Sequence, residues 1–206
     1  MAGRAPKRDR SRPVGEPSTD QAERVRRASG GRAERPRLAV VAARFNERIS
    51  ARLVDGAFHA FAAAKIPPED VDVHWVPGSF ELPFAAAHLA AGGRYAGIVC
   101  VGVVIRGQTP HFEHVAREAA AGIRQVAVTT GVPTTFGVVT ALSEEQAWNR
   151  AGGEAGNRGE EAAEAALEMA EFVERVRPRT RTRAGSGEPG RPAARRARRR
   201  LSGRRS

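Results

Sequence analysis

The chain has 206 residues and a formal net charge of +11 at pH 7, with 34 Lys and Arg against 23 Asp and Glu. The excess lies at the ends: residues 1–37 hold 11 basic and 5 acidic side chains, residues 38–174 hold 10 and 17, and residues 175–206 hold 13 and 1. The segment able to fold is therefore acidic, which excludes a basic nucleic-acid-binding domain.

The two ends contain too few apolar residues to form a core, and their composition shows no periodicity. We therefore expect disorder in a basic N-terminal extension, residues 1–37, and in an Arg-rich C-terminal tail, residues 175–206. The residues between them, 38–174, are enough for one compact domain. The C-terminal tail either binds a polyanion such as nucleic acid or is solvated without a partner, and both alternatives stay open.

Cys100 is the sole cysteine, which excludes an internal disulfide and a zinc site built from several cysteines. It lies in an apolar run, where an inert core thiol is expected. No stretch reaches the ~18 apolar residues of a membrane span. The basic N-terminus is not followed by the apolar segment of a secretory signal. We therefore expect a cytoplasmic protein without a membrane partner.

Apolar runs and helical spacing divide the domain into strands and helices. In chain order they are a strand at 38–43, a helix at 49–61, a strand at 71–76, a helix at 84–91, a strand at 98–105, a helix at 111–128, a strand at 134–140, and helices at 144–151 and 160–176. The helix at 84–91 must begin near Phe80 or Glu81, because Pro83 fits only in a first turn. The run at 98–105 is the most apolar and indicates the central strand.

This alternation predicts an α/β fold, a three-layer α/β/α domain with a four-stranded parallel sheet in flavodoxin-like order. Ligands of such sheets bind beyond the carboxyl ends of the strands. Candidate site residues are therefore sought in the four loops that follow the strands, at residues 44–46, 77–81 and 106–111, and from residue 141 onward.

The loop before the helix at 111–128 is a candidate phosphate-binding site. Residues 102–107 show the glycine spacing of a nucleotide-binding P-loop, and Thr109 fits its Ser or Thr position, but Gln108 stands where the motif needs Lys. We therefore reject a P-loop. The loop still leads into a helix N-terminus, which attracts anions. It is either a phosphate site or an ordinary turn in which the Thr109 hydroxyl caps the helix.

His111 lies in the first turn of that helix, where the dipole favours a neutral imidazole that exchanges protons near pH 7. A solvent-exposed histidine without a role is the alternative. His111 and His114 are three residues apart on one helical face and could share a metal, but no third ligand is evident.

Other candidates in these loops also have a structural alternative. Phe45 and Phe80 are either core residues or ligand-facing aromatics, and Glu81 is either a ligand contact or a first-turn acid. Arg150 has the acids Glu145 and Glu154 nearby in the sequence, so a solvated ion pair on a helix is its alternative role.

Read together, the segments resemble one family from about residue 38 to residue 174, the lumazine synthases (6,7-dimethyl-8-ribityllumazine synthases) of riboflavin biosynthesis. The motifs that carry the resemblance are R-F-N at 44–46, W-V-P-G-S-F-E-L-P at 75–83, G-V-V-I-R-G-Q-T-P-H-F at 102–112, F-G-V-V-T at 136–140 and R-A-G-G-E-A-G-N-R-G at 150–159. They fall on the four post-strand loops selected above. The two ends lie outside the resemblance.

The resemblance implies a transferase that condenses 5-amino-6-(D-ribitylamino)uracil with 3,4-dihydroxy-2-butanone 4-phosphate, releasing phosphate and water without a metal or organic cofactor. It implies that His111 is the catalytic proton-transfer residue. The ribitylaminouracil contacts that it implies are Phe45, Ser79, Phe80, Glu81, Val103, Val104, Ile105 and, across a subunit boundary, Phe136. The butanone phosphate contacts that it implies are Gln108, Thr109 and Arg150.

The resemblance also implies a homo-oligomer, a pentamer or a hollow sixty-subunit icosahedral shell, and an association with riboflavin synthase. Two other functions stay open: a scaffold that holds polyanionic cargo through its Arg-rich tail, and a riboflavin synthase of the same fold. Departures from the family are few. Gln108 stands at a variable position, and Arg158 stands where many members have lysine.

Overall fold

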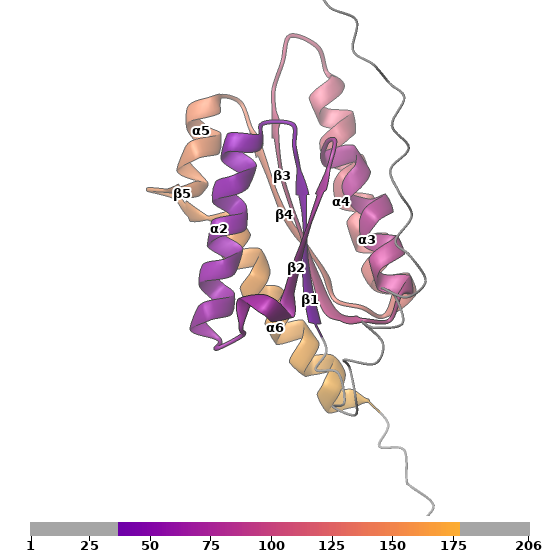
Figure 1. The fold of residues 1–206 in the computed structure, drawn as a ribbon. Coiled ribbons are helices and arrows are strands. Elements are labelled where there is room, and N and C mark those ends of the chain that lie inside the picture. The colour runs from indigo at the N-terminus through magenta and orange to yellow at the C-terminus, as the bar shows by residue number, and fades with distance from the viewer. Residues whose placement is uncertain (1–36, 178–206) are drawn as a thin grey trace, which may run out of the picture.

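Four parallel strands form the middle layer of the computed structural model, which describes residues 37–177 (Figure 1). In chain order they are β1 (Arg37–Ala43), β2 (Val71–Val76), β3 (Tyr95–Ile105) and β4 (Thr134–Ala141). Their order across the sheet is β2-β1-β3-β4, and every neighbouring pair is parallel. This is the flavodoxin-like order predicted from the sequence.

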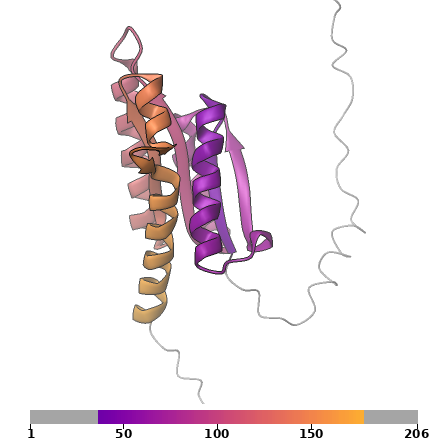
Figure 2. The ribbon, with the colours of Figure 1, turned by 90° about the vertical axis from the view of Figure 1, so that its left-hand side faces the viewer.

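Helices cover both faces of this sheet (Figures 1 and 2). On one face α2 (Glu47–Ala63) packs against α6 (Arg158–Val176), and on the other α3 (Leu82–Ala91) packs against α4 (His111–Thr130). The connecting segments add the short helix α5 (Glu144–Asn149), the 3-10 turns η1 (Pro68–Asp70) and η2 (Ser79–Glu81), and an antiparallel hairpin of β5 (Ala151–Gly153) and β6 (Gly156–Asn157).

The core explains why β1 is apolar at every position from Leu38 to Ala43. Val40 packs with the side chains beneath α2 and α6, whereas its neighbour Val41 packs with those beneath α3 and α4. Successive side chains of a strand point to opposite faces, so a strand covered on both faces needs an apolar residue at each step. Cys100 of β3 is fully buried, and burial raises the pKa of its thiol to about 12. The expectation of an inert core thiol is confirmed.

The start of α6 lies against α2 because Gly159 has no side chain. A Cβ atom at Gly159 would overlap the backbone of Leu53 in α2. The Asn157 side chain strengthens this contact. Its Oδ1 caps α6 by accepting hydrogen bonds from the N–H groups of Gly159 and Glu160, and its Nδ2 donates to the Arg52 carbonyl of α2 at 2.8 Å. The close contact fixes the position of Arg158, the first residue of α6.

Most of the predicted elements are confirmed, and the differences lie at their ends. The strand predicted at 98–105 begins three residues earlier, at Tyr95. The start expected for the helix at 84–91 is confirmed, since η2 covers Ser79–Glu81 and Pro83 stands in the first turn of α3.

The helix predicted at 144–151 is wrong at its end, because α5 ends at Asn149 and a hairpin follows. Gly152 and Gly156 have φ of 104° and 81° in this hairpin. Glycine is the residue that adopts such values without steric cost, so the two glycines allow the chain to reverse.

The ordered elements extend slightly beyond the expected domain. Arg37 belongs to β1, and α6 continues to Val176. Residues 1–36 and 178–206, which hold most of the two ends for which disorder is expected, lie outside the described residues.

Candidate active site

A cavity of about 470 Å³ lies at the carboxyl edge of the sheet, where the loops after β1, β2 and β3 meet. We call it the edge cavity. Nine residues predicted for the site line it: Phe45, Ser79, Phe80, Glu81, Val103, Val104, Ile105, Thr109 and His111. Gly107, Phe112 and Val115, which the sequence did not single out, complete the wall near α4. The position agrees with the rule that ligands bind beyond the carboxyl ends of parallel strands.

Two exposed aromatic rings stand at this cavity. Phe45 is 69% exposed and Phe80 is 58% exposed, so the alternative of core residues is wrong for both. Backbone bonds set the place of Phe45: the N–H of Arg44 donates to the Val76 carbonyl at 2.8 Å, and the N–H of Phe45 donates to the Pro77 carbonyl at 3.0 Å. The turn after β1 is therefore hydrogen-bonded to the end of β2. An exposed ring held by its backbone suits stacking on a flat ligand.

The end of β3 offers unpaired backbone groups to the same cavity. The pairing of β3 with β1 ends at Val101, whereas its pairing with β4 continues to Ile105. The N–H and C=O of one residue point to the same side of a strand, and successive residues alternate. Arg106 donates toward β4, to the Ala141 carbonyl at 2.9 Å. Ile105 therefore faces the β1 side, where no strand of the described chain pairs with it.

A buried hydroxyl also lacks a partner there. Ser79 is 4% exposed, and among the described residues its Oγ has no hydrogen-bond partner. An unpaired buried hydroxyl costs about 1–3 kcal/mol, so a polar group of a ligand or a water molecule is expected beside it. Gly102 leaves room for Ser79, because a Cβ at Gly102 would lie 2.6 Å from that Oγ.

The N-terminus of α4 forms the third side of the cavity. His111 is the first residue of the helix and is exposed. Thr109 does not cap α4, because Pro110 holds the cap position and no side chain makes a cap hydrogen bond. The alternative of an ordinary capped turn is therefore wrong. The helix end keeps backbone N–H groups for an anion. Gln108 is exposed in this loop and does not line the cavity.

The other predicted residues, Phe136 and Arg150, lie in a separate hollow of about 310 Å³ along β4, together with Arg158. We call it the β4 hollow. It shares no lining residue with the edge cavity. The sheet order β2-β1-β3-β4 puts β4 on the opposite side of β3 from β1 and Phe45. One chain therefore brings together nine of the predicted residues and leaves Phe136 and Arg150 apart from them.

Arg150 is held by groups that follow it in the chain, on the hairpin and on α6. Its guanidinium donates to the Ala155 carbonyl at 2.5 Å and lies 3.8 Å from a Glu161 carboxylate oxygen. Arg158 donates to the same carboxylate at 2.5 Å. The alternative of an ion pair with Glu145 or Glu154 is therefore wrong. Two arginines share one acid, so the hollow carries net positive charge suited to a phosphate.

Metal binding by His111 and His114 gains no support. The His114 Nδ1 lies 2.9 Å from an Arg117 guanidinium nitrogen. Among residues 37–177, no group of three His, Cys, Asp or Glu side chains is placed to hold a metal.

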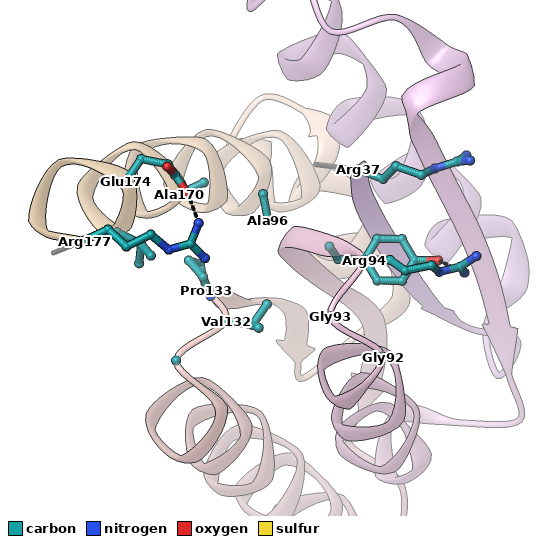
Figure 3. Close-up of a pocket in the computed structure, with 13 residues that line it drawn as sticks. Arg37, Gly92, Gly93, Arg94, Ala96, Val132, Pro133, Ala170, Glu174 and Arg177 are labelled. Carbon is teal, nitrogen blue, oxygen red and sulfur yellow. Dashed lines mark hydrogen bonds and ion pairs between the residues drawn. The ribbon is translucent and has the colours of Figure 1, made fainter. Parts of the chain in front are cut away.

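A larger cavity, about 660 Å³, lies at the opposite, amino edge of the sheet (Figure 3). Its arginines are engaged within the chain. Arg37 pairs with Asp72 at 2.7 Å, Arg94 donates to the Tyr95 hydroxyl at 2.8 Å, and Arg177 pairs with Glu174 at 2.8 Å. Burial, with the hydrogen bond to Asp72, raises the pKa of Tyr95. This cavity lacks the exposed aromatic rings and helix N-terminus of the edge cavity.

The chain is similar to known proteins over most of its length. The family model described as 6,7-dimethyl-8-ribityllumazine synthase matches residues 35–174. The protein named 6,7-dimethyl-8-ribityllumazine synthase, chloroplastic, of Arabidopsis thaliana is 44% identical over 156 residues, which cover 75% of this chain and 69% of that protein. None of the helices described here is long and apolar enough to span a membrane.

Proposed function

Since this chain belongs to the lumazine synthase family, we propose that its edge cavity and its β4 hollow are the two halves of one active site. The chain is a transferase of riboflavin biosynthesis, a 6,7-dimethyl-8-ribityllumazine synthase. It condenses 5-amino-6-(D-ribitylamino)uracil with 3,4-dihydroxy-2-butanone 4-phosphate, and releases phosphate and water. The roles of its individual residues in this reaction are our proposal.

The edge cavity binds the ribitylaminouracil. Phe45 stacks on the pyrimidine ring, and the strand end from Val103 to Ile105 offers backbone donors and acceptors to the ring's edge. The ribityl chain lies along Ser79, Phe80 and Glu81, where its hydroxyls give the unpaired Ser79 Oγ a partner.

The N-terminus of α4 binds the phosphate of the second substrate. Backbone N–H groups near Gln108 and Thr109 point at the anion, and the helix dipole favours its charge. Arg150 supplies the counter-charge and leaves its long contact with Glu161 to do so.

His111 moves the protons. The amine attacks the ketone, and loss of water gives an imine; phosphate then leaves by elimination, and attack of the second nitrogen on the remaining carbonyl closes the ring with loss of a second water. The imidazole at the start of α4 lies on the wall of the edge cavity, within the space where these bonds change. General acid–base help of this kind contributes about 10²–10⁴-fold. Holding the two substrates together contributes up to about 7–11 kcal/mol more.

We propose a homo-oligomer because the edge cavity and the β4 hollow are separate within one chain. Arg150 and Phe136 line the β4 hollow on the opposite side of β3 from the edge cavity. A second copy that brings its β4 hollow against the first copy's edge cavity completes the site. Head-to-tail contacts of this kind form a closed ring when the rotation between copies closes. A pentamer and a sixty-subunit shell both satisfy the requirement, and light scattering on the purified protein separates them.

An assay of lumazine formation from the two substrates tests the activity. Phosphate should appear in equal amount, because each turnover releases one. Incubation with lumazine alone tests the alternative of a riboflavin synthase, which would convert it to riboflavin. Co-purification with riboflavin synthase tests that association.

We also propose that the Arg-rich C-terminal tail binds polyanions, although most of it lies outside the described residues. Retention on a polyanion column should fall steeply with salt for the full chain. A variant that ends at Glu174 should be retained less and keep its activity. Equal retention of the two proteins would exclude the polyanion partner.

A cytoplasmic location stays a prediction. The Arabidopsis relative is named chloroplastic, and the chain's first 34 residues lie outside the family match. A fluorescent fusion of the full chain, observed in the cells of its source, tests the location.

A further inference from the structure

The turn between β1 and α2 has an uncommon backbone conformation directly after Phe45. Asn46 has φ 62° and ψ 43°, in the left-handed region. Most side chains avoid this region, whereas glycine, asparagine and aspartate tolerate it. Asn46 also begins α2, because its carbonyl oxygen accepts the N–H groups of Ile49 and Ser50 at 3.0 Å each.

The Asn46 side chain does not serve its own helix. It makes no cap hydrogen bond to α2. Its Nδ2 instead donates across the sheet to the Val103 carbonyl of β3 at 3.3 Å. Val103 lies beyond the last residue of β3 that pairs with β1. The Asn46 amide therefore makes the bond to β3 that a backbone N–H would have made if β1 had continued.

Phe45 is thus held between two strands. Its own N–H is bonded to Pro77 after β2, and the following residue is bonded to β3. The ring itself is mostly exposed, so backbone bonds rather than packing fix its position. Asn46 occupies the Val103 carbonyl, so that oxygen is not open to a ligand, whereas no strand of the described chain pairs with the backbone groups of Ile105 on the same side of β3.

We propose that Asn46 is a positioning residue for the first substrate: its left-handed backbone and its bond to the Val103 carbonyl hold Phe45 over the edge cavity and leave Ile105 for the pyrimidine. This role rests on the proposed function, in which Phe45 stacks on the pyrimidine. Asn46 acts through Phe45 and the strand end rather than on the reacting atoms.

Two variants separate the amide bond from the backbone conformation. Asn46→Gly keeps access to the left-handed region and removes the amide. Asn46→Asp keeps the size and the left-handed tolerance, and replaces the donor with an acceptor. Each should raise the KM for ribitylaminouracil about 3–10-fold, as the loss of one ordinary hydrogen bond predicts, and leave the KM for butanone phosphate and kcat within about twofold.

Lys65 offers a matched control, because it is the other described non-glycine residue with positive φ, 60°, and it lies in the loop after the far end of α2. Lys65→Gly should change thermal stability without changing either KM. A Lys65→Gly chain with the same rise in KM would show that glycine in a left-handed position acts through stability alone, and would overturn the positioning role.

A double-mutant cycle with Phe45→Ala tests whether Asn46 acts through the ring. In the Phe45→Ala background, Asn46→Gly should raise the KM for ribitylaminouracil by less than about twofold. Additive effects, equal effects on both substrates, or an Asn46→Asp chain with wild-type KM would each overturn the role of Asn46. A Phe45→Ala chain with wild-type KM would instead overturn the stacking assignment of the proposed function, and the role of Asn46 with it.

Discussion

The edge cavity and the β4 hollow differ in chemistry although both lie beside the carboxyl-terminal part of β3. The edge cavity presents aromatic rings, a buried hydroxyl and backbone groups, with His111 at its wall. The β4 hollow presents two guanidinium groups that share Glu161. The edge cavity therefore suits a flat, hydroxyl-rich ligand, and the β4 hollow offers positive charge to a phosphate. In the proposed function the α4 N-terminus of the edge cavity and the arginines of the β4 hollow hold the phosphate together.

Removal of the proton-transfer group should have the largest effect on turnover. His111→Ala should lower kcat by about 10–10³-fold, because proton transfer is lost while both substrates remain positioned. The fold should survive, since the side chain is exposed at the start of α4. Steady-state kinetics with circular dichroism as the folding control measure this. Wild-type turnover would remove His111 from the mechanism.

Removal of charge from the β4 hollow should affect one substrate. Arg150→Ala should raise the KM for butanone phosphate about 10–100-fold, as expected for the loss of a charge-assisted bond, and should leave the KM for ribitylaminouracil within about twofold. Arg124→Ala, at an exposed position in α4, is a control that removes a guanidinium away from both halves. Equal weakening toward both substrates would mean that Arg150 holds the fold rather than the phosphate.

The smallest effect is expected at the buried hydroxyl of the edge cavity. Ser79→Ala should raise the KM for ribitylaminouracil about 2–10-fold, because one hydrogen bond to the ribityl chain is lost. The same change should leave thermal stability equal or higher, because it removes an unpaired buried oxygen. Steady-state kinetics measure the expected loss of substrate binding, and thermal melting measures the expected equal or higher stability. A chain that is less stable and binds normally would make Ser79 a structural residue.

The sequence predicted the layers and the edge cavity, because both follow from backbone periodicity. The apolar run of β1 required cover on both faces, and the carboxyl ends of parallel strands meet at one edge. The residues that line the edge cavity therefore lie close together for a reason visible in the sequence.

Periodicity could not predict contacts that depend on side-chain geometry or on chain reversals. The bond from Asn46 to Val103 joins residues 57 positions apart. The partner of Arg150 is Glu161, on α6, because the glycines of the hairpin turn the chain back before that helix begins. Local spacing instead favoured Glu145 and Glu154. The separation of Phe136 and Arg150 from the edge cavity follows from strand order, which no local pattern expresses.

The most direct test of a site shared between copies is complementation of two variants, each impaired in one half of the site, assayed at a butanone phosphate concentration well below the KM of the Arg150→Ala chain. One chain carries Phe45→Ala with His111→Ala in the edge cavity, and the other carries Arg150→Ala in the β4 hollow. In oligomers mixed from equal amounts of the two, random assembly should leave about a quarter of the sites with two intact halves, so activity should rise well above that of either variant. Activity equal to the average of the two variants would contradict a shared site, and would mean that each chain completes its site alone.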